Sequence, residues 1–299
     1  MSYTELSLLE FQHRFSTEQA CQDALEQARW PVGFVCPRCG HNKASRIRTR
    51  RLLQCSACHH QTSLTAGTVL HKTRTPLVKW FWAIWLVSQD KGGISAMRLA
   101  KQLRLGYRTA WTILHKLRKA MRERDARYTL TGSIEMDDAF FGGAASGKRG
   151  RGAPNKSKVV VMVEDEGERA GYLAMKVVPT VNAEQIQAAA EAKIQPGQDI
   201  HTDGLHAYRV LERTGHHHHP QVVPPKQASE ILPWVHIVIS NAKRYLLGTF
   251  HGVSPKYLQA YLDEFSYRFN RRFREAELPA RLMAACMSAK PVTLAELKA

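Results

Sequence analysis

Two closely spaced pairs of cysteines constrain the N-terminal part of this 299-residue chain more than any other feature. Cys36 and Cys39 form the first pair, and Cys55 and Cys58 form the second after the intervening residues 40–54. Each pair can form a tight turn that directs two thiolates to one point, and four sulfur ligands around one ion are typical of structural zinc. The spacing therefore predicts a zinc ribbon, in which the metal builds the fold and has no open position for chemistry.

The competing interpretation is that these cysteines form two disulfide bonds. No signal peptide is recognisable, so we expect a reducing compartment in which thiols persist. The other two cysteines, Cys21 and Cys286, stand alone and are expected to be small buried side chains rather than nucleophiles. His59 and His60 follow the last cysteine directly, but four thiolates already complete a zinc shell, so both are expected on the surface.

The charge of the chain points to a polyanionic partner. The formal net charge is +17, from 43 lysines and arginines against 26 acidic residues. The clustering of this charge favours nucleic acid over a generally basic surface. The longest apolar run, residues 80–87, is far shorter than the roughly 20 residues of a membrane span. We therefore expect a cytoplasmic, nucleoid-associated protein that binds double-stranded DNA and no membrane.

A helical region after the cysteines has the pattern of a helix-turn-helix. Ser95 can cap a helix that ends near residue 103, and a second helix is expected over 107–121. Residues 98–124 contain nine lysines or arginines and one acid, as expected of helices laid against phosphates. A plain helical hairpin with a solvated basic face is the alternative. The residues predicted to contact DNA here are Arg104, Arg108, Thr109, Thr112 and Lys116.

After residue 131 the pattern changes from helical to alternating. Strands are expected over 133–138, 158–164 and 171–178, followed by a helix over 182–192 and a short strand over 199–204. This is the order of a ribonuclease-H-like mixed α/β sheet, in which the first and fourth strands lie side by side. A generic mixed α/β domain is the alternative.

Two carboxylates belong to the strands that are predicted to be neighbours. Asp137 is in the first strand and Asp203 is in the fourth, 66 residues later (203 minus 137). Two Mg²⁺ ions about 4 Å apart can activate the attacking oxygen and stabilise the leaving oxygen in phosphodiester cleavage. Because Mg²⁺ prefers carboxylate ligands, the pair predicts a two-metal site, with Asp137 bridging the ions.

Six longer motifs give the chain a resemblance to a known family. They occupy residues 29–34, 65–68, 135–143, 202–204, 248–254 and 261–272. On these motifs the chain resembles, nearly end to end, the DDE-type insertion-sequence transposases with an N-terminal zinc ribbon, the IS1595 family. The resemblance implies that Asp137 is catalytic and that Asp138 is a neighbour that caps or packs.

The resemblance also implies a third catalytic residue seven positions before a lysine on a later helix, and no glutamate stands there. Counting back from Lys243 gives His236, and seven residues are almost two helical turns, so the two share a face. If residues 235–239 are extended and the helix starts near Ser240, Asn241 takes this place instead. Lys243 is expected to hold a phosphate oxygen or the leaving group. Imidazole is a softer ligand than carboxylate, so the affinity of the site for Mn²⁺ should rise relative to its affinity for Mg²⁺.

Two further basic segments are predicted to contact the DNA backbone. One is the loop over 148–158, with five lysines or arginines and no acid, for which a disordered hairpin tip is the alternative. The other lies near residue 270. The residues predicted in these segments are Lys148, Arg149, Arg151, Arg271 and Arg272. Four consecutive histidines at 216–219 are interpreted as a solvated loop.

We therefore predict a transposase that binds the ends of an insertion sequence, hydrolyses the 3′ strands and joins them to target DNA. The predicted segments are a helical arm (1–30), a zinc ribbon (31–70), a helix-turn-helix linker (71–128), a ribonuclease-H-like domain (129–275) and a C-terminal tail (276–299). The predicted cofactors are structural Zn²⁺ and two catalytic Mg²⁺ or Mn²⁺ ions, the latter held by Asp137, Asp203 and His236. We expect at least a dimer, because two ends must be held together. The alternatives are a catalytically inactive DNA-binding regulator and a structure-specific nuclease.

Overall fold

The computed structural model describes residues 6–142, 156–222 and 231–299. The chain divides into two compact units. The first, here called the helical unit, comprises Met1–Arg124 together with Phe273–Ala299, and the second, the sheet unit, comprises Asp125–Arg272. Within the described ranges, no helix combines the length and the hydrophobicity that crossing a bilayer requires.

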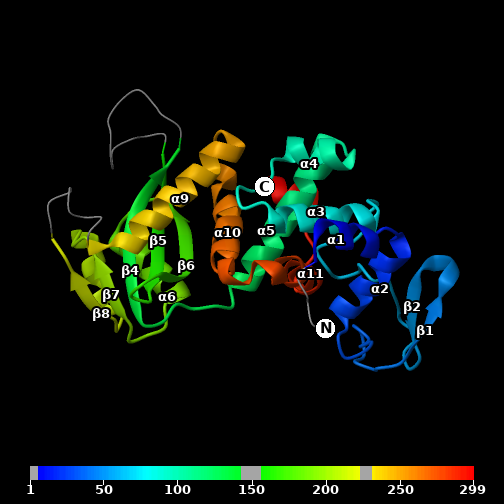
Figure 1. Ribbon diagram of the computed structural model, residues 1–299. Coiled ribbons are helices and arrows are strands. Elements are labelled where there is room, and N and C mark those ends of the chain that lie inside the picture. Colours follow the sequence, from blue (N-terminus) through cyan, green and yellow to red (C-terminus); the bar gives the residue numbers. More distant parts are fainter. Residues whose placement is uncertain (1–5, 143–155, 223–230) are drawn as a thin grey trace. The chain divides into compact units, whose positions relative to one another are not determined.

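The helical unit begins with two capped helices and a small sheet (Figure 1). Ser7 and Thr17 accept backbone N–H groups at the starts of the two helices and so stabilise their first turns. The elements are α1 (Leu8–Arg14), α2 (Glu18–Arg29), β1 (Ala44–Ile47), β2 (Leu52–Cys55) and β3 (Gln61–Thr62). The three strands are antiparallel in the order β1-β2-β3, and the predicted zinc ligands lie around them.

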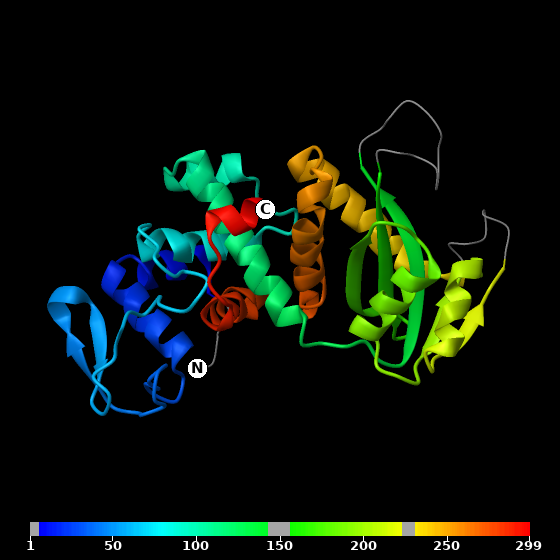
Figure 2. The same cartoon turned by 180° about the vertical axis from the view of Figure 1, so that it is seen from behind.

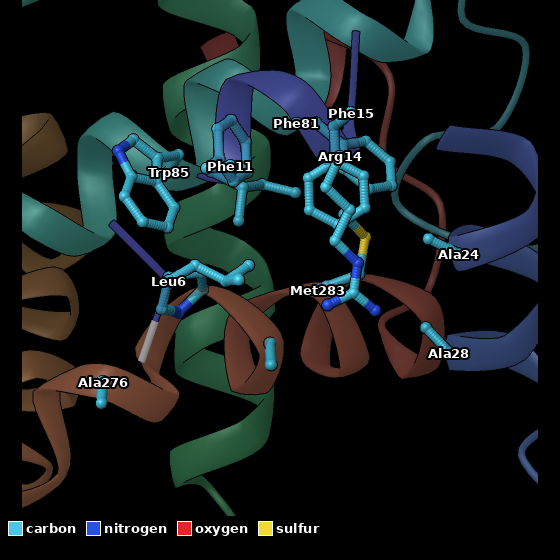
Figure 3. Close-up of a pocket in the computed structure, with 13 residues that line it drawn as sticks. Leu6, Phe11, Arg14, Phe15, Ala24, Ala28, Phe81, Trp85, Ala276 and Met283 are labelled. Atoms are coloured by element: carbon cyan, nitrogen blue, oxygen red, sulfur yellow. The ribbon is translucent and has the colours of Figure 1, made fainter. Parts of the chain in front are cut away.

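Five further helices complete the helical unit. They are α3 (Leu77–Gln89), α4 (Ala96–Leu103), α5 (Tyr107–Asp125), α11 (Leu278–Ser288) and α12 (Leu294–Lys298). Ser95 accepts the N–H of Arg98 and caps α4 as predicted, and three residues separate α4 from α5. The helix α11 packs against α2 and α3. Side chains of α1, α2, α3 and α11 line an apolar cavity of about 90 Å³, with Arg14 among them (Figure 3).

The sheet unit is a mixed α/β structure built on five strands. These are β4 (Ser133–Phe141), β5 (Ser157–Asp165), β6 (Ala170–Val178), β7 (Asp199–Thr202) and β8 (His217–Pro220). Their spatial order is β6-β5-β4-β7-β8. The strands β4, β5 and β6 form an antiparallel meander, whereas β4 pairs with β7, and β7 with β8, in parallel. The first and fourth strands are therefore neighbours, which confirms the predicted sheet order.

Helices cover both faces of this sheet. The elements are α6 (Ala183–Lys193), the short η2 (His206–Arg209) and α7 (Val210–Arg213) on one face, and α9 (Pro233–Phe250) on the other (Figures 1 and 2). After α9, η3 (Pro255–Tyr257) leads into α10 (Leu258–Phe269), which packs against α9 and along β6. Side chains alternate along β4: Ile134 and Met136 pack in the core with α6, and Ala139 and Phe141 pack in the core with α9. Glu135 and Asp137, which share the parity of Ala139, therefore face α9.

The interpretation of the four histidines as a solvated loop is wrong. His217 to His219 belong to β8, which pairs with β7 along its length. The side chain of His218 is fully buried, and its Nε2 lies 2.9 Å from the Thr202 hydroxyl oxygen. A run of identical polar residues has no alternation that could indicate a strand, so this one depends on tertiary pairing.

Candidate active site

Residues of β4 and β7 are paired at a constant offset. The ladder joins Ser133 to Asp199 and Glu135 to His201, which is an offset of 66 residues. The same offset, continued one residue past the end of β7, relates Asp137 to Asp203. Asp137 is 9% exposed, and Asp203 is half-buried. Asp137 is the middle residue of β4 and Asp203 directly follows β7, so the continued register places the two predicted metal ligands at the same level of the sheet.

The turn after β7 is shaped around Asp203. The Asp203 carboxylate accepts the N–H of Leu205 at 3.0 Å, which is the geometry of an Asx turn. Gly204 has φ +78°, and a Cβ there would lie 2.6 Å from Cγ2 of Val222. Only glycine is tolerated in this conformation at this distance. The turn explains the sequence Thr202-Asp203-Gly204 on physical grounds.

The helix α9 brings His236 to the first aspartate. Its Nδ1 lies 3.9 Å from Oδ2 of Asp137, with side-chain exposures of 32% and 13%. This separation is longer than a hydrogen bond. It is compatible with both atoms ligating one cation, because two metal–ligand bonds of roughly 2.1 Å can span about 4 Å. The structure therefore brings His236, the predicted third catalytic residue, close to Asp137.

The helix begins at Pro233, so the alternative in which 235–239 is extended is wrong. Val235, Val238 and Ile239 are buried against the sheet, and this packing overrides their preference for strands. Asn241 is five residues, or about 140°, from His236 on this helix and belongs to a different face. The reason for placing Asn241 in the third position is thereby removed.

Lys243 follows two turns after His236 on α9, close to Asp137 and Phe141. Its ammonium lies 5.7 Å from the centroid of the Phe141 ring. Desolvation lowers the pKa of Lys243, Lys156 lowers it further, and the negative charge of Asp137 opposes the shift. An ammonium group beside the Asp137 carboxylate suits contact with a phosphate oxygen.

Sequence reasoning missed the role of Glu135. This residue is 2% exposed, and its Oε2 accepts the N–H of Val235 in the first turn of α9 at 2.7 Å. Burial raises the pKa of Glu135 to about 7, although the amide of Val235 opposes the shift. The available signal was the i, i+2 spacing of Glu135 and Asp137, together with the lack of a capping residue before Pro233.

The four predicted zinc ligands converge at the start of the small sheet. Their Sγ atoms all lie within 4.8 Å of one another, and the pairs Cys36–Cys58 and Cys39–Cys55 are 3.6 Å apart. Burial of Cys36 opposes ionisation, but amide N–H groups, including that of Cys39, more than offset it and lower its pKa to about 6. Four soft donors around one point fit a structural zinc ion.

The two cysteine turns share one backbone design. Gly40 donates to the Cys36 carbonyl at 2.9 Å, and His59 donates to the Cys55 carbonyl at 3.1 Å. Gly40 (φ +76°) and His59 (φ +55°) both adopt the left-handed conformation. His59 is exposed and His60 half-buried. These histidines therefore belong to the turn and not to the sulfur cluster.

The predicted DNA-contacting residues of α4 and α5 differ in exposure. Arg104 and Arg108 are exposed, and Thr109 and Thr112 are half-buried. The Thr112 hydroxyl donates to the carbonyl of Arg108 at 2.7 Å, as threonine does within a helix. Lys116 is 9% exposed, and burial lowers its pKa. Because Lys116 lies in the fully buried stretch of α5, it is not retained as a phosphate contact.

The arginines near residue 270 are engaged within the sheet unit. Arg271 is 7% exposed and donates to Oδ1 of Asp125 at 2.6 Å and to the Tyr267 carbonyl at 2.8 Å. Arg272 donates to the carbonyls of Ala170 and Phe269. These contacts stabilise the fold, so neither arginine is retained as a DNA contact. Lys148, Arg149 and Arg151 lie outside the described residues.

Comparison with known proteins gives two family matches and one curated relative. A family described as "ISXO2-like transposase domain" matches residues 129–270, and one described as "Transposase zinc-ribbon domain" matches residues 16–61. The relative is an "Uncharacterized protein in transposable element ISH50" from Halobacterium salinarum, 26% identical over 226 residues. The alignment covers 66% of this chain and 71% of that protein.

Two solved structures are also similar in part. A "pre-cleavage Mos1 transpososome" is 14% identical with a TM-score of 0.27, over 71% of this chain and 78% of that chain. A "Mos1 mariner paired end complex with Mn" is 17% identical with a TM-score of 0.29, over 67% and 75%. These scores are too low to support an argument about fold, which rests on the sheet order described above.

Proposed function

Because this chain belongs to the insertion-sequence transposase family defined by the ISXO2-like domain and its zinc ribbon, we propose that it is an active DNA transposase. It binds the ends of its element, hydrolyses the 3′ strands and joins the freed 3′ hydroxyl groups to target DNA. The observation that carries this proposal is the approach of His236 on α9 to Asp137 on β4, at 3.9 Å. The β4–β7 register, continued two residues beyond the pair Glu135 and His201, relates Asp137 to Asp203.

The residues of this site fit divalent cations. Asp137, Asp203 and His236 offer two carboxylates and one imidazole, a donor set that Mg²⁺ accepts and Mn²⁺ accepts more readily. When bound, two such ions supply an activated oxygen nucleophile and stabilise the charge on the phosphorus centre. The chain's own contribution is to hold these three donors in place.

The other residues of the site act on the DNA itself. Lys243, on the same face of α9 as His236, binds a non-bridging phosphate oxygen or the leaving oxygen as a point charge. The low exposure of Asp137 limits its contact with bulk water. A partly desolvated site strengthens the attraction between Lys243 and the phosphate. Lys243 therefore orients the scissile phosphate against the carboxylates.

The helical unit supplies end recognition in this proposal. The exposed Arg104 and Arg108 of the α4–α5 pair support contact with DNA as a helix-turn-helix. The zinc ribbon provides a second contact with DNA. Residues 27–89 contain neither aspartate nor glutamate, so no acidic side chain of this segment repels the phosphates. Two element ends must be held together for joining, so the working assembly is at least a dimer.

The test is cleavage and joining of a labelled duplex that carries a candidate element end, in Mg²⁺ and in Mn²⁺. Wild-type protein is compared with Asp137→Ala, Asp203→Ala and His236→Ala, and Asn241→Ala is the matched control on the same helix. We expect joined products for wild type and Asn241→Ala and none for the other three. Cleavage without joining would indicate a nuclease, and binding without cleavage in either metal would indicate a catalytically inactive regulator.

A further inference from the structure

The first turn of α9 is held by carboxylates that come from the sheet. A helix leaves its first N–H groups without partners in the helix, and a preceding Ser, Thr, Asp or Asn normally accepts one of them. Here Leu232 occupies the capping position and makes no side-chain cap. Instead, Glu135 of β4 accepts the N–H of Val235 at 2.7 Å. Asp165, the last residue of β5, accepts the indole N–H of Trp234 at 3.0 Å.

The Glu135 contact does more than cap the helix, because it also links α9 to β4. A carboxylate that is 2% exposed is costly unless it is hydrogen-bonded, and the positive end of a helix dipole compensates it. A local cap would satisfy the same N–H group without burying a glutamate side chain. The cap used here lies 100 residues earlier in the chain, on the strand that carries Asp137. It therefore ties the position of α9 to that strand.

The geometry of this tie places the proposed metal ligands. Glu135 and Asp137 are two residues apart on β4 and face α9, so their Cα atoms are roughly 6.6 Å apart along the strand. Val235 and His236 are consecutive on α9. Glu135 thus holds Val235 against one position of β4, and His236 lies 3.9 Å from Asp137, two residues further along the strand.

We propose that Glu135 is a positioning residue of the catalytic site: by accepting the Val235 N–H, it sets the height and rotation of α9 at which His236 and Asp137 share a cation. This inference rests on the proposed function for the identity of the site. The Trp234–Asp165 contact anchors the same turn of α9 to β5 and does not involve the strand that carries Asp137. It therefore provides a matched comparison.

The experiment measures Mn²⁺ binding to the zinc-loaded full-length chain by electron paramagnetic resonance. Asp137→Asn identifies the signal that belongs to this site. Loss of an outer-shell partner commonly weakens metal binding by about 10–100-fold, and we expect at least a tenfold loss for Glu135→Ala. Glu135→Gln keeps the shape and an acceptor oxygen and should stay within about threefold of wild type. Trp234→Phe should bind Mn²⁺ like wild type.

Activity provides the second readout. Glu135→Ala should lower the cleavage rate at saturating DNA and leave the Kd for the element end unchanged. If Glu135→Ala does not fold, Glu135→Asp replaces it: the carboxylate is one methylene shorter, so Mn²⁺ binding should still weaken.

Wild-type Mn²⁺ affinity in a folded Glu135→Ala or Glu135→Asp protein would overturn the proposal. An equal loss of affinity in Trp234→Phe would also overturn it, because Glu135 would then act only through helix stability. Failure of the proposed function looks different. In that case wild type binds Mn²⁺ in a manner dependent on Asp137 and Glu135 and yet cleaves no DNA.

Discussion

Replacing Arg271 with alanine should destabilise the sheet unit and leave DNA binding intact. The guanidinium donates to Asp125 and to the Tyr267 carbonyl, and its central carbon lies 3.7 Å from the centroid of the Tyr267 ring. Only 7% of the Arg271 side chain and 15% of the Asp125 side chain are exposed. The substitution would therefore leave a mostly buried carboxylate without the guanidinium that pairs with it.

The expected magnitude follows from this burial. Removing one partner of a buried ion pair costs about 3–5 kcal/mol, and the residual exposure of Asp125 places this pair at about 3 kcal/mol. For a unit of this size, such a loss lowers Tm by about 6–12 °C. Arg271→Lys keeps the charge but loses the planar fork and the ring stacking, so it should have an intermediate effect.

The assay is hydrogen exchange of β4 and β5 peptides, combined with DNA binding at several salt concentrations. Arg271→Ala should lower the protection of these strands by a factor of about 150, equivalent to 3 kcal/mol, with the salt dependence of DNA binding unchanged. Arg108→Ala is the control with the opposite expectation, because Arg108 is exposed. Unchanged protection in Arg271→Ala, with a salt slope reduced by about one ion, would show that Arg271 contacts phosphate and would refute the argument.

Three further predictions concern zinc, acid and the Asp203 turn. Cys39→Ser should abolish retention of zinc after dialysis against a chelator, measured by elemental analysis, and should expose the β1–β3 amides to exchange. Burial, with Arg118, lowers the pKa of His115 to about 3. The free energy of unfolding of the helical unit should therefore fall by up to about 1.4 kcal/mol per pH unit as pH falls from 6.5 toward 3. Urea midpoints measured over this range should show the decrease, and His115→Gln should remove it. Gly204→Ala should lower cleavage, and Val222→Ala in the same chain should relieve the clash but not the strained φ, so that measured activity recovers only in part.

The sequence pattern predicts those elements that are determined by residues close together in the chain. Cys36 and Cys39 determine their own turn, and the alternation along 133–138 separates the apolar side chains that pack with α6 from the carboxylates that face α9, so both were predictable. The Ser95 cap lies within one turn of its partner. The contact of Glu135 with Val235 spans 100 residues, and no local period reports it. The burial of His218 depends in the same way on β7.

The residues at the end of α10 show which groups of the fold surround the arginines near residue 270. Gln259 pairs with the N–H of Val177 and the carbonyl of Met175, and Asn270 pairs with both backbone groups of Leu173. The two amides are eleven residues apart, close to three helical turns, so both face β6, which is an edge strand.

An uncovered edge strand presents unpaired N–H and carbonyl groups to other chains. The helix α10 satisfies several of these groups on β6, and Arg272 extends the cover to the Ala170 carbonyl. In sequence, residues 268–274, with four arginines and no acid, resemble a basic DNA-binding segment. The distinction lies in the adjacent strand, because carbonyl groups at a sheet edge accept guanidinium hydrogen bonds as phosphate oxygens do. A run of arginines therefore indicates DNA contact only where the fold offers those arginines no such acceptors.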